Sequence, residues 1–157
     1  MKNRTNIERK SDTEMVVTRT FDALARIVFD AWSRPELFRR WWVPESANMS
    51  LLSCDMDVRA GGEYRLVFRH PQTGQPMAFF GVYKEATPEK RLVWTNEESD
   101  QGAVTTVTFE EVAGKTLVTL HERYPTKAAL DEALAGSAEG LPEQFQQLDA
   151  LLMQIGG

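Results

Sequence analysis

The spacing of apolar residues divides the first part of the chain into a tail, a strand and a helix. Residues 1–13 are polar and are expected to form a flexible tail. Residues 15–20 (MVVTRT) are rich in β-branched side chains, which predicts a strand. Over residues 21–32 the period changes to that of a helix, with Asp22 as a candidate N-cap. The apolar stripe of this helix holds Leu24, Ile27, Val28, Ala31 and Trp32.

A second short helix is predicted directly after the first. Ser33 and Glu36 have the spacing of a capping box, and Pro35 suits a first helical turn. This helix would run through residues 37–42 (LFRRWW). It would stop before Pro44, because the residue before a proline is driven out of the helical region.

Between residues 51 and 123 apolar and polar positions mostly alternate, which is the period of strands. Turn signals such as Ala60-Gly61-Gly62 and Ala113-Gly114 separate the runs. Strands joined so closely cannot make parallel crossovers, so the pattern predicts an antiparallel meander. The predicted strands lie near residues 51–58, 63–69, 77–85, 91–97, 103–110 and 116–123.

The chain becomes helical again after Pro125. Thr126 can cap a turn or two that runs through Leu134. An interruption or kink is then expected at Gly136, Gly140 and Pro142. The last stretch, residues 141–155, carries one continuous apolar face made of Leu141, Phe145, Leu148, Leu152 and Ile155.

This order of elements predicts an α+β fold. A sheet with one apolar face needs cover, and the long C-terminal helix is the natural lid. We therefore expect a helix-grip fold, in which a curved antiparallel sheet of about seven strands wraps around that helix. Two short helices would lie between the first and second strands. A chain of 157 residues supports one core, so residues 14–157 are expected to form a single domain.

Charge and composition narrow the range of partners. The net charge is −5, which argues against binding to nucleic acids or to anionic membranes, because both need clustered positive charge on the protein.

Cys54 is the only cysteine, so no internal disulfide forms and a reducing cytoplasm is expected. No apolar run approaches the roughly 18 residues of a membrane span. The sequence leaves a monomer and a homodimer equally open.

Alternation along the strands predicts which side chains face the helix. In GEYRLVFR the set Tyr64, Leu66 and Phe68 points inward, and its neighbours point to solvent. The same rule turns a few polar residues inward, of which Glu122 is the sharpest case. Glu122 is either a polar anchor in a ligand cavity with a raised pKa, or a strand-end carboxylate that reaches water or pairs with an arginine.

Two of the four tryptophans, Trp41 and Trp42, are adjacent. Neighbouring helical positions point about 100° apart, so the two rings cannot face the same way. One is expected to pack into the core, and the other to lie near the open end of the sheet. The pair is interpreted either as the rim of a cavity mouth or as a plug that holds the short helices to the sheet. Trp32 and Trp94 are predicted to be interior.

No catalytic constellation is visible in the sequence. His70 falls in a loop and His121 on the outward face, so no histidine cluster for a metal is predicted. Cys54 has no Cys-x-x-Cys partner and is interpreted as a small core residue. Pairs such as Glu110-Glu111 are adjacent only in sequence, because strand neighbours face opposite sides. The sequence therefore predicts no catalytic residue, metal or cofactor, and favours a protein that is not an enzyme.

Five segments in order resemble one known family. They are RTFDALARIVFDAWSRPELFRRWWVP, CDMDVRAGGEYRLVFR, FGVYKEATPEKRLVWT, TTVTFEEVAGKTLVTLHE and EGLPEQFQQLDALL, which lie between residues 19 and 152, and the similarity as a whole covers residues 14–155. The family is named for homology to the activator of the heat-shock chaperone ATPase. It belongs to the START and birch-pollen-allergen superfamily, also called SRPBCC.

This resemblance implies a helix-grip fold with a cavity between the sheet and the closing helix. Across the superfamily that space binds lipids, sterols, polyketides or other apolar molecules. The chain departs from the family pattern at Leu141, where tryptophan is common, and at Glu122, where histidine is common. The residues expected to contact a ligand are Trp42, Met56, Tyr64, Leu66, Phe68, Phe79, Tyr83, Trp94, Asn96, Phe109, Leu120, Glu122, Leu141, Phe145 and Leu148.

Three functions are compatible with these features. The first is a binding module that encloses an apolar or aromatic small molecule. The second is a cyclase-like or hydrolase-like enzyme that uses Glu122 or Tyr83 as acid or base. The third, suggested by the family name, is an interaction protein that acts on a chaperone. Fold analogy alone does not choose among them.

Overall fold

The computed structural model of the chain describes residues 5–47, 49–97, 100 and 102–155. These residues form eight strands, three α-helices and one short 3-10 helix. Their bounds are β1 (Asn6–Arg9), β2 (Glu14–Phe21), α1 (Ala25–Ser33), α2 (Pro35–Phe38), η1 (Glu45–Ala47), β3 (Ser50–Met56), β4 (Glu63–Arg69), β5 (Pro76–Thr87), β6 (Arg91–Thr95), β7 (Val104–Val112), β8 (Lys115–Arg123) and α3 (Lys127–Ile155).

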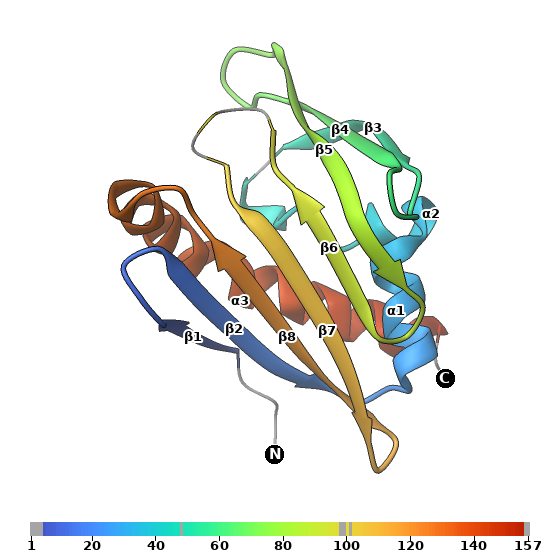
Figure 1. Cartoon of the computed structure of the whole chain (residues 1–157). Coiled ribbons are helices and arrows are strands. Elements are labelled where there is room, and N and C mark those ends of the chain that lie inside the picture. The colour runs from blue at the N-terminus through green and yellow to red at the C-terminus, as the bar shows by residue number, and fades with distance from the viewer. Residues whose placement is uncertain (1–4, 48, 98–99, 101, 156–157) are drawn as a thin grey trace.

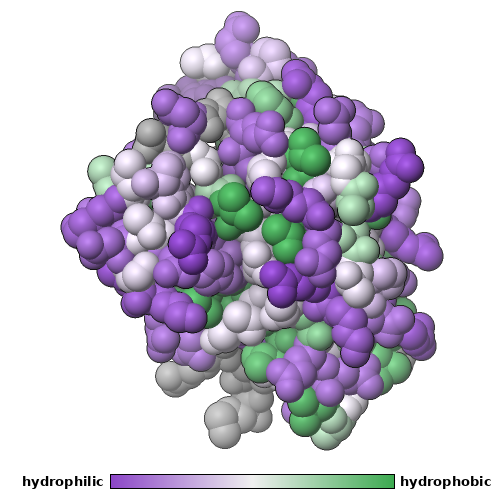
Figure 2. All heavy atoms as spheres, in the orientation of Figure 1, coloured by the Kyte–Doolittle hydropathy of each residue, from purple (hydrophilic) through white to green (hydrophobic). Residues whose placement is uncertain are grey.

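The strands form one curved antiparallel sheet in the order β1-β2-β8-β7-β6-β5-β4-β3. The α3 helix lies along one face of this sheet, and α1 and α2 lie at one end of it (Figure 1). The opposite face of the sheet is mainly hydrophilic, with only scattered hydrophobic residues (Figure 2). The helix-grip prediction is therefore confirmed. The seven predicted strands are all present, with ends that differ from the prediction by at most two residues.

The core lies between the sheet and α3. Alternate residues of β2, β4, β7 and β8 are buried. In β4, for example, Tyr64, Leu66 and Phe68 are buried while Glu63 and Arg69 are exposed. From the helix, Leu130, Leu141, Phe145, Leu148, Leu151 and Leu152 are buried against this face. The rings of Phe21 and Phe145 meet edge to face with centroids 5.5 Å apart. Ile155, which the pattern placed on the buried stripe, is exposed at the end of the helix.

Both predicted capping arrangements of the short helices are wrong. The α1 helix begins three residues after Asp22, and its first N–H, that of Ala25, donates to the Glu111 carboxylate at 2.9 Å. Ser33 does not cap α2, because its hydroxyl donates back to the Phe29 carbonyl at 2.8 Å. The hydrogen-bond acceptor at the start of α1 is therefore Glu111 on β7, and not Asp22 as predicted.

The α3 helix is longer than the sequence predicts. Thr126 caps it as expected, accepting a hydrogen bond from the Ala129 N–H at 3.1 Å. The helix then continues without a break through Gly136, Gly140 and Pro142 to residue 155. Buried leucines on both sides of this stretch pack on the sheet. Their packing outweighs the local helix-breaking preference of glycine and proline.

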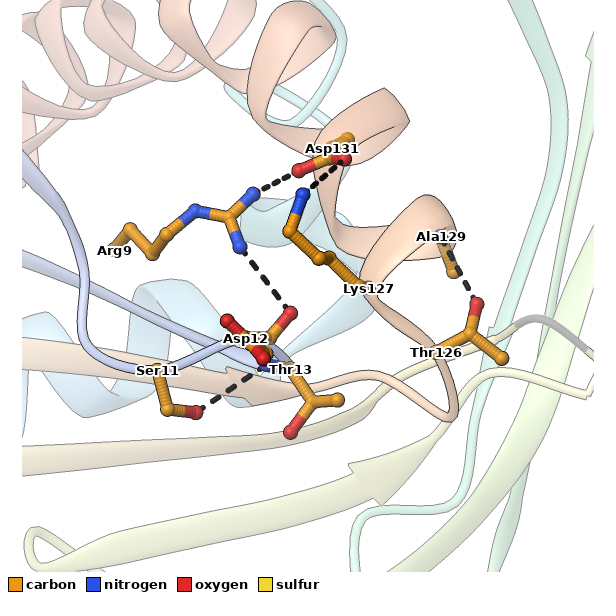
Figure 3. Close-up of polar contacts among 8 residues, drawn as sticks. All are labelled: Arg9, Ser11, Asp12, Thr13, Thr126, Lys127, Ala129 and Asp131. Atoms are coloured by element: carbon orange, nitrogen blue, oxygen red, sulfur yellow. Dashed lines mark hydrogen bonds and ion pairs between the residues drawn. The ribbon is translucent and has the colours of Figure 1, made fainter.

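Residues 6–9, which the sequence placed in a loose tail, form the edge strand β1. This strand pairs with β2, from Asn6 opposite Thr18 to Arg9 opposite Met15. Its end is tied to the start of α3 by an ion pair between Arg9 and Asp131, and Asp131 also pairs with Lys127 within the helix (Figure 3). Among the described residues, no helix has both the length and the apolar character needed to cross a membrane.

Candidate functional site

A pocket of about 350 Å³ lies between one end of the sheet, the short helices and α3. Its floor comes from alternate residues of β3 to β6, and its cover comes from α1, α2 and the segment that follows α2. The lining is largely aromatic and aliphatic, with few polar groups. It consists of Trp32, Phe38, Trp42, Val43, Pro44, Met49, Met56, Tyr64, Leu66, Phe68, Phe79, Tyr83, Trp94, Asn96 and Gln144.

The two adjacent tryptophans have different positions, as predicted. Trp41 is fully buried, and its indole N–H donates to the Ala31 carbonyl at 2.9 Å. Trp42 is partly exposed, stacks on Phe38 with ring centroids 4.7 Å apart, and lines the pocket. Trp41 therefore holds the helical segment to the core, while Trp42 forms part of the pocket wall.

Aromatic rings pack side by side along the pocket floor. The Tyr64 and Tyr83 rings lie 5.7 Å apart between centroids, and the Phe68 and Phe79 rings lie 5.3 Å apart. Burial raises the pKa of the Tyr83 phenol far above its usual range. Tyr83 is consequently a neutral hydroxyl at physiological pH, which does not suit the role of general base.

A chain of hydrogen bonds runs across the inner face of the sheet. The Tyr64 hydroxyl contacts the Thr95 carbonyl at 2.7 Å and the Asn96 side-chain oxygen at 3.2 Å. The Asn96 amide donates to the Thr105 hydroxyl at 3.1 Å, which in turn donates to the Glu122 carboxylate at 2.8 Å. These inward polar groups are therefore satisfied by one another rather than left unpaired.

Glu122, at the end of this chain, faces a second pocket of about 330 Å³. Its other carboxylate oxygen accepts a hydrogen bond from the Tyr124 hydroxyl at 2.7 Å. Burial raises the pKa of Glu122, although the two hydrogen bonds and the nearby His121 oppose the shift. The lining consists of Trp42, Leu120, Glu122, Ala133, Gly140, Leu141 and Gln144, so Trp42 and Gln144 belong to both pockets.

The residues predicted to contact a ligand fall into three groups. The first pocket is lined by Trp42, Met56, Tyr64, Leu66, Phe68, Phe79, Tyr83, Trp94 and Asn96. The second pocket is lined by Leu120, Glu122 and Leu141, and again by Trp42. Phe109, Phe145 and Leu148 line neither pocket and are packed in the core. Whether any of them binds a ligand stays a prediction.

The sequence pattern missed the residues that cover the first pocket. Val43, Pro44 and Met49 come from an irregular segment, for which alternation gives no inward or outward direction. Gln144 was missed because it is polar and lies beside the apolar stripe of α3. The side-chain amide of Gln144 donates a hydrogen bond to the backbone carbonyl of Trp42. This bond ties α3 to the segment that covers the pocket.

The remaining candidate groups for chemistry serve local structure. The ring of His121 is hydrogen-bonded to Glu14 at 2.7 Å. In the turn, His70 accepts hydrogen bonds from the backbone N–H groups of Gln72 and Thr73. Burial raises the pKa of the Cys54 thiol. Within the part of the chain that the structure describes, no group of three or more potential metal ligands comes together.

Comparisons with known proteins agree with this fold. A family model described as "Activator of Hsp90 ATPase homolog 1-like protein" matches residues 22–153. A crystal structure of a protein from Rhodobacter sphaeroides has a TM-score of 0.87 at 24% identity, covering 97% of this chain and 99% of that one. A solution structure of a Staphylococcus epidermidis protein has a TM-score of 0.80 at 30% identity, covering 95% and 94%.

A third similar structure is an AHSA1-like protein from Aeromonas hydrophila, with a TM-score of 0.70 at 20% identity over 87% of this chain and 93% of that one. The comparison with curated proteins finds no match. The family model thus gives the family, and the solved structures agree on the fold.

Proposed function

The chain belongs to the family described as "Activator of Hsp90 ATPase homolog 1-like protein", and from this premise we propose that it is a binding protein for a small apolar or aromatic molecule. The ligand would lie in the first pocket, between the aromatic floor of the sheet and the cover that carries Trp42. The observation that carries the proposal is the pocket itself, with its largely apolar lining.

The size and chemistry of the pocket suit such a ligand. Small-molecule sites commonly enclose roughly 300–1,000 Å³ and combine apolar walls with a few polar groups. The pocket of about 350 Å³ lies at the lower end of that range. Burial of apolar ligand surface contributes about 25 cal/mol per Å², so a mainly apolar molecule can bind without any charged contact.

A neutral fluorescent dye, N-phenyl-1-naphthylamine, tests the proposal. The dye is expected to bind the wild-type protein, with enhanced fluorescence as it leaves water. Leu66→Trp places a larger side chain in the pocket floor and is expected to reduce dye affinity about tenfold or more. The matched control is Leu52→Trp on the same sheet, because Leu52 is 45% exposed and lines neither pocket.

Circular dichroism checks that both variants keep the wild-type fold. If Leu66→Trp unfolds the chain, Met56→Trp replaces it, since Met56 also lines the pocket but is partly exposed. Equal dye affinity in the wild type and in a folded pocket variant would overturn the proposal. So would the absence of dye binding to the wild type.

The family description favours a second candidate, activation of a chaperone ATPase. In that case the protein would act on a chaperone instead of enclosing a small molecule. An ATPase assay with purified chaperone distinguishes the two. If the wild-type protein and Leu66→Trp raise the ATPase rate of the chaperone equally, the result would support activation. If a tenfold molar excess of the wild-type protein leaves the ATPase rate unchanged, activation is ruled out.

A further inference from the structure

The two pockets contain one carboxyl group and no cationic side chain. Among the described residues that line either pocket there is no lysine, arginine, histidine or aspartate, and Glu122 is the only glutamate. An anionic ligand would therefore find no opposite charge in the first pocket and would meet a carboxylate in the second. A cationic ligand would find one matching group.

Glu122 is held by neutral donors alone. Thr105 and Tyr124 each donate one hydrogen bond to it, one to each carboxylate oxygen. None of the ion pairs among the described residues includes Glu122. Each carboxylate oxygen has a second lone pair, so the group can accept further hydrogen bonds. Glu122 is partly buried, so its carboxylate has lost part of its contact with water, and a ligand cation would offset that loss.

The geometry of the shared wall links this carboxylate to the apolar pocket. Trp42 and Gln144 line both pockets, so the two spaces adjoin at these side chains. The indole ring of Trp42 is also the type of aromatic face that attracts an organic cation most strongly. An elongated molecule that passes Trp42 would thus have an apolar end on the aromatic floor and a polar end near Glu122.

We propose that the ligand is an amine with an apolar body, which lies in the first pocket while its ammonium group contacts the Glu122 carboxylate in the second. This inference rests on the proposed binding function and names the chemical class of its ligand. Burial disfavours the charged form of Glu122, and an ammonium ion in contact with the carboxylate would stabilise that form.

Three competitors of equal chain length test the inference against the same dye. Octylamine, 1-octanol and octanoate are titrated at pH 7.5 into the wild-type protein with bound N-phenyl-1-naphthylamine. Octylamine is expected to bind at least tenfold more tightly than octanoate, with octanol between them. A charge-assisted hydrogen bond accounts for a difference of about that size. This ranking needs no variant and so does not depend on how a variant folds.

The variant Glu122→Gln tests whether Glu122 causes the preference for the amine. It keeps the shape of the side chain, and it is expected to lower the affinity for octylamine about tenfold while the affinity for the dye stays within a factor of two. The matched control is Glu110→Gln, which removes one carboxylate from the exposed side of β7 and is expected to change neither affinity.

The outcomes separate the two proposals. Dye that binds but is displaced as well by octanoate as by octylamine would overturn the amine inference and leave the binding function standing. An amine preference that persists in folded Glu122→Gln would also overturn it, because the cation would then be recognised elsewhere. Absence of dye binding would overturn the binding function and this inference together.

Discussion

At the scale of single residues, Gly81 shows how one missing side chain shapes the pocket floor. It lies opposite Tyr64 in the register of β4 and β5. A Cβ atom at Gly81 would come within 2.0 Å of the Thr95 carbonyl oxygen on β6. Without that atom, β5 approaches β6 closely, and the Tyr64 phenol reaches across β5 to the Thr95 carbonyl at 2.7 Å.

Gly81→Ala is expected to destabilise the protein by about 2 kcal/mol or more, because the added methyl group meets backbone that cannot turn away. Gly140→Ala is the matched control on α3, where the nearest atom to an added Cβ is the Gln144 side-chain oxygen at 4.0 Å. That change should stabilise the helix by about 0.5–1 kcal/mol. Urea denaturation measures both, and a neutral Gly81→Ala would contradict the close approach of the two strands.

The inward direction of most pocket residues could be predicted from the sequence, because alternation needs only the strand period. Tyr64, Phe68 and Trp94 follow that rule. Phe145 shows its limit, since a residue can face inward and still be packed away from the pocket. Which inward side chain borders empty space depends on the volumes of its neighbours across the sheet, and these are not local in sequence.

At the scale of elements, α3 is held to the sheet by a partly buried ion pair as well as by its apolar stripe. The Arg19 guanidinium on β2 pairs with the Asp149 carboxylate on α3. Arg19 is 5% exposed, whereas Asp149 is 35% exposed. Burial raises the pKa of Asp149 even though Arg19 lowers it, so the pair orients the helix more than it adds net stability.

Asp149→Ala is expected to cost about 2 kcal/mol in urea denaturation, because it leaves the Arg19 charge buried without its partner. The partial exposure of Asp149 makes this less than the loss in a fully buried pair. Asp131→Ala on the same helix is the control and should cost less, since its partners Arg9 and Lys127 are solvent-exposed. Equal losses in the two variants would contradict the special role of the Arg19 pair.

The helix lengths mark where sequence rules for elements succeed and fail. The Thr126 cap was predictable, because a cap depends on neighbours three residues away. The continuity of α3 through Pro142 was not, because it results from packing of Leu130 and Phe145 against strands that are distant in the chain. The same reason explains why Glu111, rather than Asp22, accepts the first N–H of α1.

At the scale of the whole molecule, the fold results from the need to bury the apolar face of the sheet, which α3 covers. The order of strands in the meander was predictable because each turn is short. The added edge strand β1 was not, since its sequence is polar and its pairing with β2 depends on backbone hydrogen bonds. The pocket remains where the short helices and α3 do not fill the space over β3 to β6.

The most direct measurement of ligand enclosure is a two-dimensional ¹H–¹⁵N NMR titration of the four tryptophan indole signals with N-phenyl-1-naphthylamine. Trp32, Trp42 and Trp94 line the first pocket, so their signals are expected to shift as the dye binds. The Trp41 signal should move least, because its indole N–H is buried and bonded to the Ala31 carbonyl. Saturable shifts in that order would support enclosure of an apolar molecule between sheet and helix. Unchanged Trp42 and Trp94 signals at saturating dye would contradict it.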